Sequence, residues 1–278
     1  MEYRILVDSC TDLPKQLKED THFKIIPLSL MVDEKVFVDN DGFSQKEFLR
    51  TMKGSPNSPK SACPSPEDYM REFSEDGDTF IVTLSSELSG SYNSAELAKR
   101  LYLEDNPNKK IEVFDSRSAS VGQTLITMKI KQFISEGHKF EDIVQKVNAF
   151  RSGMKTKFVL ESLDNLRKNG RLSHLQAIVA NVLNIKPVMG ATPEGTITKF
   201  DQARGITKAL ISMAKIIERD VIKPQERILA IAHCNCVERA IFVKEEILKR
   251  VPFMDCFIVD TAGVSTMYAN EGGIIVAY

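Results

Sequence analysis

A hydroxyl-rich turn between an apolar run and an amphipathic segment constrains the fold of this chain most strongly. Residues 80–84 read Phe-Ile-Val-Thr-Leu. This run is short, β-branched and without alternation, which is typical of a strand buried in a parallel sheet. Residues 84–95 read Leu-Ser-Ser-Glu-Leu-Ser-Gly-Ser-Tyr-Asn-Ser-Ala, and from Tyr92 onward apolar residues recur at helical spacing. The turn is therefore expected where a strand passes into a helix.

Such a turn can bind an anion. Free backbone N–H groups at a helix start, the positive end of the helix dipole and several serine hydroxyls can hold a carboxylate or phosphate without a lysine. The alternative is that the serines only cap the helix and satisfy the turn. Residues 84–95 alone do not decide between these interpretations, and they do not name a ligand.

Two further polar turns follow predicted strands. Residues 8–14 (Asp-Ser-Cys-Thr-Asp-Leu-Pro) follow a strand at 3–7, and residues 115–118 (Asp-Ser-Arg-Ser) follow a strand at 111–114. The carboxyl ends of parallel strands meet at one edge of a sheet. We therefore expect the three turns to share one crevice.

The length of 278 residues favours two domains. In residues 1–155 predicted strands alternate with helices, which indicates a parallel-sheet α/β/α domain. Residues 156–278 contain short strands, hairpin-like turns and flanking helices, which indicates an α+β domain. The individual expectations include one strand at 23–32, a helix with a capping box at 44–52, an extended proline-rich loop at 54–66, a buried helix at 173–185, two short strands at 186–189 and 195–198, and helices at 204–221 and 237–251.

Composition excludes several classes of protein. The 37 basic and 38 acidic residues give a formal charge of -1, so no global field attracts nucleic acid or an anionic membrane. No apolar run approaches the roughly 20 residues needed for a membrane span. Five scattered cysteines suit a reducing compartment, and the first residues lack the features of a signal peptide. We therefore expect a cytoplasmic protein.

Signatures of catalysis are missing. A serine hydrolase would place its nucleophile in Gly-x-Ser-x-Gly, but Ser89 has Glu87 and Ser91 at the glycine positions. The pair Cys-x-Cys at 234–236 lacks the second pair of a zinc site, and no P-loop or dinucleotide fingerprint occurs. None of the four histidines stands in a recognisable catalytic pattern; they are His22, His138, His174 and His233.

We therefore predict no catalytic residues and no metal, and favour a binding protein over an enzyme. One alternative is a hydrolase or phosphatase that acts on a small anionic substrate in the same crevice. A third interpretation is a regulatory module that uses its second domain as a docking surface.

Six motifs in order resemble the DegV family over nearly the full chain. They are Asp-Ser-x-x-Asp-Leu at 8–13, Lys-Ser-Ala-Cys-Pro-Ser-Pro at 60–66, the serine-rich turn at 85–95, Asp-Ser at 115–116, Gly-Arg-Leu-Ser at 170–173 and Ile-Lys-Pro at 185–187. The family consists of bacterial fatty-acid-binding proteins, some of which present the fatty acid to a fatty acid kinase that phosphorylates its carboxylate. The resemblance implies a DegV-like fold with a long-chain fatty acid, such as palmitate or stearate, in a tunnel between the domains. It implies no other cofactor.

The resemblance also implies which residues hold the carboxylate. The family's loop hydroxyl is Ser61 here, and the serine of its Ser-Gly pair is Ser89. The backbone amides around Gly90 and Ser91 would add donors, and Tyr268 stands where many members place a histidine. A tyrosine donates a hydrogen bond but is not a cation near neutral pH.

Three other residues are weaker candidates for the binding site. Arg171 and Ser116 are supporting candidates, and Arg171 is expected rather to anchor a turn between the domains. Arg204 is a candidate either for the ligand or for a partner-facing surface.

Overall fold

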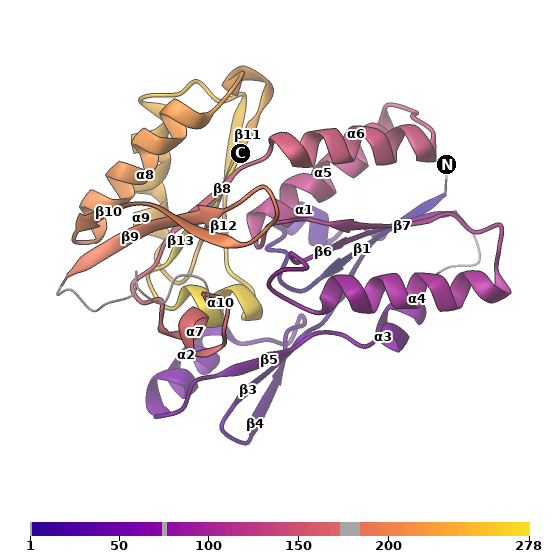
Figure 1. Ribbon diagram of the computed structural model, residues 1–278, viewed down its shortest axis with the longest axis horizontal. Coiled ribbons are helices and arrows are strands. Elements are labelled where there is room, and N and C mark those ends of the chain that lie inside the picture. Colours follow the sequence, from indigo (N-terminus) through magenta and orange to yellow (C-terminus); the bar gives the residue numbers. More distant parts are fainter. Residues whose placement is uncertain (1, 74–76, 173–183) are drawn as a thin grey trace.

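The computed structural model describes residues 2–73, 77–172 and 184–278. Within them the strands form three sheets, which Figure 1 shows as two large sheets side by side and a small one at their edge. Sheet A has the order β2-β1-β6-β7, sheet B the order β4-β3-β5, and sheet C the order β10-β9-β8-β13-β11-β12. The fold is the predicted mixed α/β architecture, with a parallel sheet first and a mixed sheet second.

Sheet A is parallel throughout and is covered on both faces. Its strands are β1 (Tyr3–Asp8), β2 (Phe23–Ile26), β6 (Asp78–Thr83) and β7 (Ile111–Asp115). One face packs against α3 (Pro66–Met70) and α4 (Ser91–Asp105). The other packs against α1 (Lys15–Lys18), α5 (Val121–Ser135) and α6 (Phe140–Gly153). The interiors of β1 and β6 are fully buried apolar runs because helices lie on both sides.

Sheet C combines antiparallel pairs with one parallel pair, β11 and β12. Its strands are β8 (Thr156–Val159), β9 (Ile185–Ala191), β10 (Ile197–Arg204), β11 (Ile228–His233), β12 (Asp255–Asp260) and β13 (Ile274–Ala277). Helices α8 (Ile206–Asp220) and α9 (Val237–Leu248) cover one face, and the 3-10 helix η2 (Pro224–Glu226) precedes β11. The strand predicted at 186–189 is the longer β9. The strand predicted at 195–198 starts only at Ile197 and continues to Arg204, so Gly195 and Thr196 belong to the connection between the two strands.

Helix α5 is shared between the two large sheets. Ile126 and Ile130 pack into the core of sheet A, whereas Val121 and Leu125 pack against alanines of β11 and β13. Both faces of this helix are apolar, which explains why it is buried along most of its length. The expected domain boundary at residue 155 stays a prediction; sheet A ends before it and sheet C begins at Thr156.

Sheet B corrects two expectations. The single strand predicted at 23–32 is two strands, β2 in sheet A and β3 (Ser29–Val32) in sheet B. Pro27 lies between them and has no N–H group for a ladder bond. The proline-rich loop contains a short strand, β5 (Lys60–Ala62), which pairs with β3 so that Ser61 lies opposite Leu30. The third strand of this sheet, β4 (Lys35–Val38), forms a hairpin with β3.

The remaining helices are α2 (Gln45–Gly54), α7 (Asp164–Lys168) and α10 (Gly263–Ala269). Ser44 caps α2 as predicted by accepting a hydrogen bond from Glu47 N, but the Glu47 side chain pairs with Lys35 at 2.6 Å and does not close a capping box. Gly170 follows α7 with φ +78°, as expected of a helix stop. Helix α10 was not predicted. The expected helix at 173–185 falls mostly outside the described residues, and Ile185 belongs to β9.

Candidate functional site

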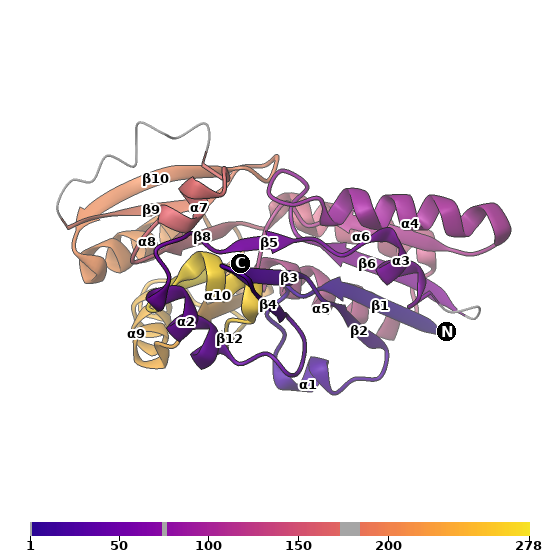
Figure 2. The same ribbon diagram turned by 90° about the horizontal axis from the view of Figure 1, so that it is seen from below.

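The three polar turns meet at one edge of sheet A, as predicted. Asp8, at the end of β1, accepts hydrogen bonds at its Oδ2 from Leu84 N and Ser91 Oγ, each at 2.6 Å. Ser85 N donates to Ser118 O over 2.9 Å, which joins the turn after β6 to the turn after β7. Figure 2 shows β1, β6 and the start of α4 converging on this edge. Backbone and side-chain bonds together therefore fix the shape of the crevice.

The Ser91 side chain stabilises the crevice and does not face into it. Its hydroxyl is buried, donates to Asp8 and lies 2.7 Å from the Tyr69 hydroxyl oxygen. Asp8 also accepts from Gln123 Nε2 at 2.8 Å, and burial raises the pKa of this carboxyl group. The Ser91 side chain is thus committed to the protein interior. Only its backbone amide faces the turn, where it donates to Ser89 Oγ at 3.2 Å.

An apolar cavity extends from the crevice into the space between the turns, the inner face of sheet C and α10. It contains about 730 Å³ of empty space, part of it open to solvent. Its lining is almost entirely apolar. The lining residues are Cys10, Leu84, Leu88, Ser118, Ala119, Thr156, Phe158, Leu160, Leu166, Arg171, Ala191, Gly195, Thr196, Ile197, Val264, Ser265, Tyr268, Ala269 and Ile275.

Three of the predicted site residues come together at this cavity. Arg171 and Tyr268 line it, and the Ser61 hydroxyl oxygen lies 3.2 Å from the Tyr268 hydroxyl oxygen. The Arg171 guanidinium lies 6.0 Å from the centre of the Tyr268 ring. Its Nε donates to Leu88 O at 3.1 Å and its Nη1 donates to Asn169 O. Arg171 therefore anchors two turns, as expected, and also contributes to the cavity wall.

Ser89 and Gly90 lie on the turn that faces the Ser61 strand. Ser94 Oγ donates to Pro64 O at 2.6 Å, and a Cβ atom on Gly90 would come within 3.1 Å of Cys63 Sγ. The two loops are thus in contact. Within the described part of the chain, the Ser89 O–H and the Gly90 N–H have no protein acceptor. Neither residue is part of the cavity lining itself.

Two candidates lie away from the cavity. The Ser116 hydroxyl is buried in its own turn, where it donates to Ser118 O at 3.0 Å and accepts from Ser118 N at 3.1 Å. Arg204 is exposed at the end of β10. The sequence correctly placed Ser116 in a polar turn, but the side chain stabilises that turn and does not reach the cavity lining.

Sequence reasoning missed the residues that fix α10, the helix that carries Tyr268. Asp39 accepts from Gly263 N at 2.7 Å and Val264 N at 2.9 Å, and Asp12 accepts from Ala262 N at 2.6 Å. Burial raises the pKa of Asp12 to about 7 and that of Asp39 to about 6. Asp12 stands in the predicted turn at 8–14 and Asp39 follows β4, and neither position gives a local sign that the side chain reaches a segment more than 200 positions away.

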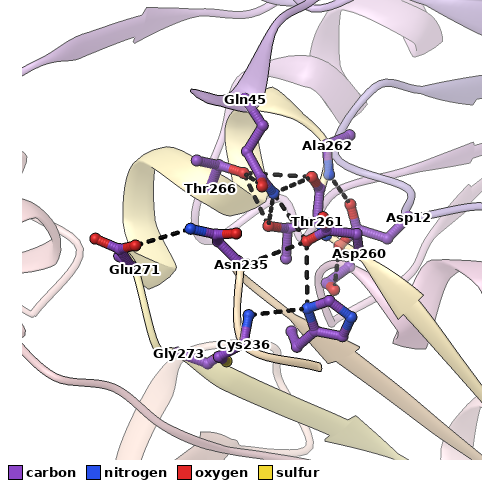
Figure 3. Close-up of polar contacts among 12 residues, drawn as sticks. Asp12, Gln45, Asn235, Cys236, Asp260, Thr261, Ala262, Thr266, Glu271 and Gly273 are labelled. Carbon is purple, nitrogen blue, oxygen red and sulfur yellow. Dashed lines mark hydrogen bonds and ion pairs between the residues drawn. The ribbon is translucent and has the colours of Figure 1, made fainter. Parts of the chain in front are cut away.

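Gln45 makes a second connection to α10 (Figure 3). Its Nε2 donates to Asp260 Oδ1 at 2.9 Å, to Thr261 O at 2.9 Å and to Thr266 Oγ1 at 3.2 Å. One amide group thus ties the start of α2 to the end of β12 and to α10. The cavity wall that α10 supplies is held from the N-terminal half of the chain.

Among the described residues, none of the three histidines His22, His138 and His233 is part of the cavity lining. His233 is nearly buried, its Nδ1 lies 3.3 Å from Asp260 Oδ1 and accepts from Cys236 N at 3.3 Å, and burial lowers its pKa. His174 lies outside the described residues. In the described ranges no group of three or more His, Cys, Asp or Glu side chains could hold a metal ion. Nor does any helix there have both the length and the apolar character needed to cross a bilayer.

Comparisons with known proteins agree with this architecture. A DegV domain-containing protein of Streptococcus gordonii is 38% identical over 284 residues, covering 100% of this chain and 99% of that protein. A crystal structure of a DegV family protein from Ruminococcus gnavus, described with vaccenic acid, has a TM-score of 0.97 and 47% identity, covering 100% of this chain and 99% of that one. The Streptococcus pneumoniae Fatty Acid Kinase (Fak) B3 protein, loaded with linoleic acid, has a TM-score of 0.91 and 36% identity over the same shares.

The sequence model of the family described as "Uncharacterised protein, DegV family" matches residues 2–278. The matched range includes the three polar turns at the edge of sheet A, the loop that bears Ser61 and the helix that bears Tyr268. With the full-length relatives, it establishes that this chain belongs to the DegV family.

Proposed function

We propose that this protein binds a long-chain fatty acid, with the acyl tail in the apolar cavity and the carboxylate at the hydroxyl groups of its mouth. The observation that carries the proposal is the cavity. Its lining is almost wholly apolar, and it includes Tyr268, whose hydroxyl group contacts that of Ser61. The relatives from R. gnavus and S. pneumoniae support it, because their structures are described with vaccenic and linoleic acid.

The tail supplies the affinity in this proposal. Burial of one methylene group contributes roughly 0.8 kcal/mol, so a palmitate or stearate tail contributes on the order of 10 kcal/mol before ordering costs. Leu84, Leu88 and Phe158 offer only carbon atoms to such a tail.

The carboxylate of the fatty acid needs hydrogen-bond donors that replace the water molecules it loses on binding. Removing a carboxylate from water costs several kcal/mol unless donors take over its hydrogen bonds. Ser61, Tyr268 and Ser89 supply hydroxyl donors, and the Gly90 amide lies at the start of α4, near the positive end of its dipole. The Ser91 amide acts through Ser89, because it donates to Ser89 Oγ. Arg171 adds a charge at the wall. Ser116 acts here only through the shape of its turn.

The protein is proposed to carry its ligand and not to transform it. In the described residues no histidine lines the cavity, and burial raises the pKa of Cys10 well above its ordinary value, which favours the unreactive thiol. The likeness to the Fak B3 protein leads us to propose a fatty acid kinase as partner. All five cysteines are unpaired, which fits a reducing cytoplasm.

Native mass spectrometry of the purified full-length protein, followed by lipid extraction, tests the proposal. We expect a copurified C16–C18 fatty acid in about one-to-one ratio, and rebinding of palmitate after delipidation. The Ser61→Ala Ser89→Ala double variant should bind palmitate more weakly, whereas Ser135→Ala, on the exposed end of α5, should not. An empty protein that fails to bind palmitate and hydrolyses a phosphate or carboxylate ester would overturn it.

A further inference from the structure

A second cleft lies behind the wall of the apolar cavity. It contains about 1060 Å³ of empty space, part of it open to solvent, between the turn after β7, the end of α6, the start of β8 and the β9–β10 turn. Thr156 and Ala191 line both spaces. A hydrogen bond of 2.6 Å between Ser118 Oγ and Thr156 Oγ1 lies in the wall between them. The cleft is therefore a separate site, one residue layer from the cavity.

Positive charge dominates the lining of this cleft. Four cations, Arg117, Arg151, Lys155 and Lys157, face one lining carboxylate, that of Asp220. The Nζ atoms of Lys155 and Lys157 lie 3.9 Å and 3.4 Å from the same oxygen of Asp220, so the two positive charges share one negative charge. The whole chain has a formal charge of -1, so this excess is local.

The two arginines have no carboxylate partner within 4 Å in the described part of the chain. Arg151 Nη1 donates to Asp115 O at 2.9 Å, but its buried Nε has no hydrogen-bond partner. The nearby Asp115 carboxylate is taken up by Ser86 Oγ at 2.6 Å and by Arg117 N at 2.9 Å. Burial and the charge of Arg117 both lower the pKa of Arg151. A partly buried guanidinium charge without a carboxylate partner is costly, and an anion bound in the cleft beside it would offset that cost electrostatically.

Lys157 adds a second buried cation. It is 2% exposed, and its Nζ lies 3.7 Å from the centre of the Phe200 ring. Burial lowers its pKa, since its single shared carboxylate offsets the loss of water only in part. The ammonium group and the arginines line the same cleft from different elements, so their charges add inside it.

We propose that this cleft binds the phosphate or diphosphate group of a small soluble ligand. Guanidinium groups present paired N–H donors that match phosphate oxygens. Arg117 uses one donor on Pro193 O at 3.2 Å and keeps others for a ligand. The space exceeds that of a phosphate group, which leaves room for the rest of the molecule. The inference is independent of fatty-acid binding in the neighbouring cavity.

Titration of the full-length protein with sodium pyrophosphate and with inorganic phosphate, at constant ionic strength of about 0.15 M, tests the proposal. Arginine Nε–Hε signals report the contact in NMR spectra, and Arg151→Lys identifies the Arg151 signal. We expect a saturable shift of that signal. We also expect calorimetry to give at least tenfold weaker pyrophosphate binding for Arg117→Gln Arg151→Gln and for Lys155→Gln.

The matched control is Arg50→Gln Arg100→Gln, which removes two exposed positive charges elsewhere. This control should bind pyrophosphate like the unmodified protein. Circular dichroism and copurified lipid content should be unchanged in every variant. No saturable shift up to about 10 mM ligand, or an equal loss of affinity in the control, would overturn the proposal. Binding to phosphatidate vesicles without binding of either soluble anion would also overturn it, since the ligand would then be a lipid head group.

Discussion

The hydroxyl oxygens of Ser61 and Tyr268 lie 3.2 Å apart, although 207 positions separate the two residues. Ser61 is held on β5 by pairing with β3, and Tyr268 is held on α10, whose first turn is bound by Asp39. The contact therefore joins the two halves of the chain at the edge of the cavity. It also means that changes far from the cavity can displace the proposed carboxylate donors.

Tyr268→Phe tests the hydroxyl of this pair without emptying the cavity wall. The ring that lies beside Arg171 is retained, and only the donor is lost. Hydrogen bonds to charged groups contribute about 1.5–3 kcal/mol, so we expect palmitate binding to weaken roughly ten- to hundredfold. Tyr102→Phe, on α4 and outside the cavity lining, should leave affinity unchanged. Equal affinities of Tyr268→Phe and the unmodified protein in calorimetry would remove Tyr268 from the carboxylate site.

Asp39→Asn tests how α10 is held. The carboxylate accepts hydrogen bonds from two consecutive backbone N–H groups, and an asparagine would turn one acceptor into a donor facing an N–H. We expect the free energy of unfolding in urea to fall by about 2 kcal/mol near neutral pH. Asp41→Asn, two positions away and exposed, should change it by less than about 0.5 kcal/mol. Matching unfolding curves for the two variants would contradict the anchoring role.

The raised pKa of Asp12 predicts a stability that depends on pH. Burial raises this pKa from 3.8 to about 7. Between pH 3.8 and about pH 7 the folded protein therefore keeps a proton on Asp12 that the unfolded chain has already released. The stabilisation by this proton is complete below pH 3.8 and is lost as the pH rises through about 7.

Urea unfolding at several pH values measures the effect. Relative to Asp12→Asn, which cannot titrate, the unmodified protein should lose roughly 2 kcal/mol between about pH 5 and about pH 7. Using the difference between the two proteins cancels the contribution of other carboxyl groups. A difference that is constant with pH would show that Asp12 titrates alike in the folded and unfolded chain.

Gln45 is predicted to act as a clamp between α2 and α10. Loss of its amide in Gln45→Ala leaves acceptors on Thr261 and Thr266 without this donor, and we expect about 1–2 kcal/mol lower stability. Gln45→Glu should be worse, because its carboxylate would face the Asp260 oxygen that the amide now contacts at 2.9 Å. In thermal unfolding we expect the midpoint temperature to be highest for the unmodified protein, lower for Gln45→Ala and lowest for Gln45→Glu. A Glu variant as stable as the unmodified protein would exclude the clamp.

Several features were predictable because local sequence specifies them. The strands expected at 3–7, 80–84 and 111–114 are β1, β6 and β7, and helical spacing from Tyr92 onward indicated α4. The helices expected at 204–221 and 237–251 are α8 and α9, with ends that differ by three residues or fewer. The prediction failed at 23–32, where the apolar pattern continues through Pro27 although the backbone cannot. It also missed α10, a seven-residue helix whose first N–H groups depend on Asp39 and Asp12.

The sequence by itself determined that three polar turns lie at one sheet edge, since strand direction follows from the alternation of strands and helices. It also indicated Ser61, Ser89 and Tyr268 as candidates, but only through resemblance to a family. The tertiary structure alone decided that the Ser61 hydroxyl lies beside that of Tyr268 and that the Ser91 hydroxyl donates to Asp8. The physical reason is that these contacts join residues from separate elements, and their distances depend on packing rather than on the local chain.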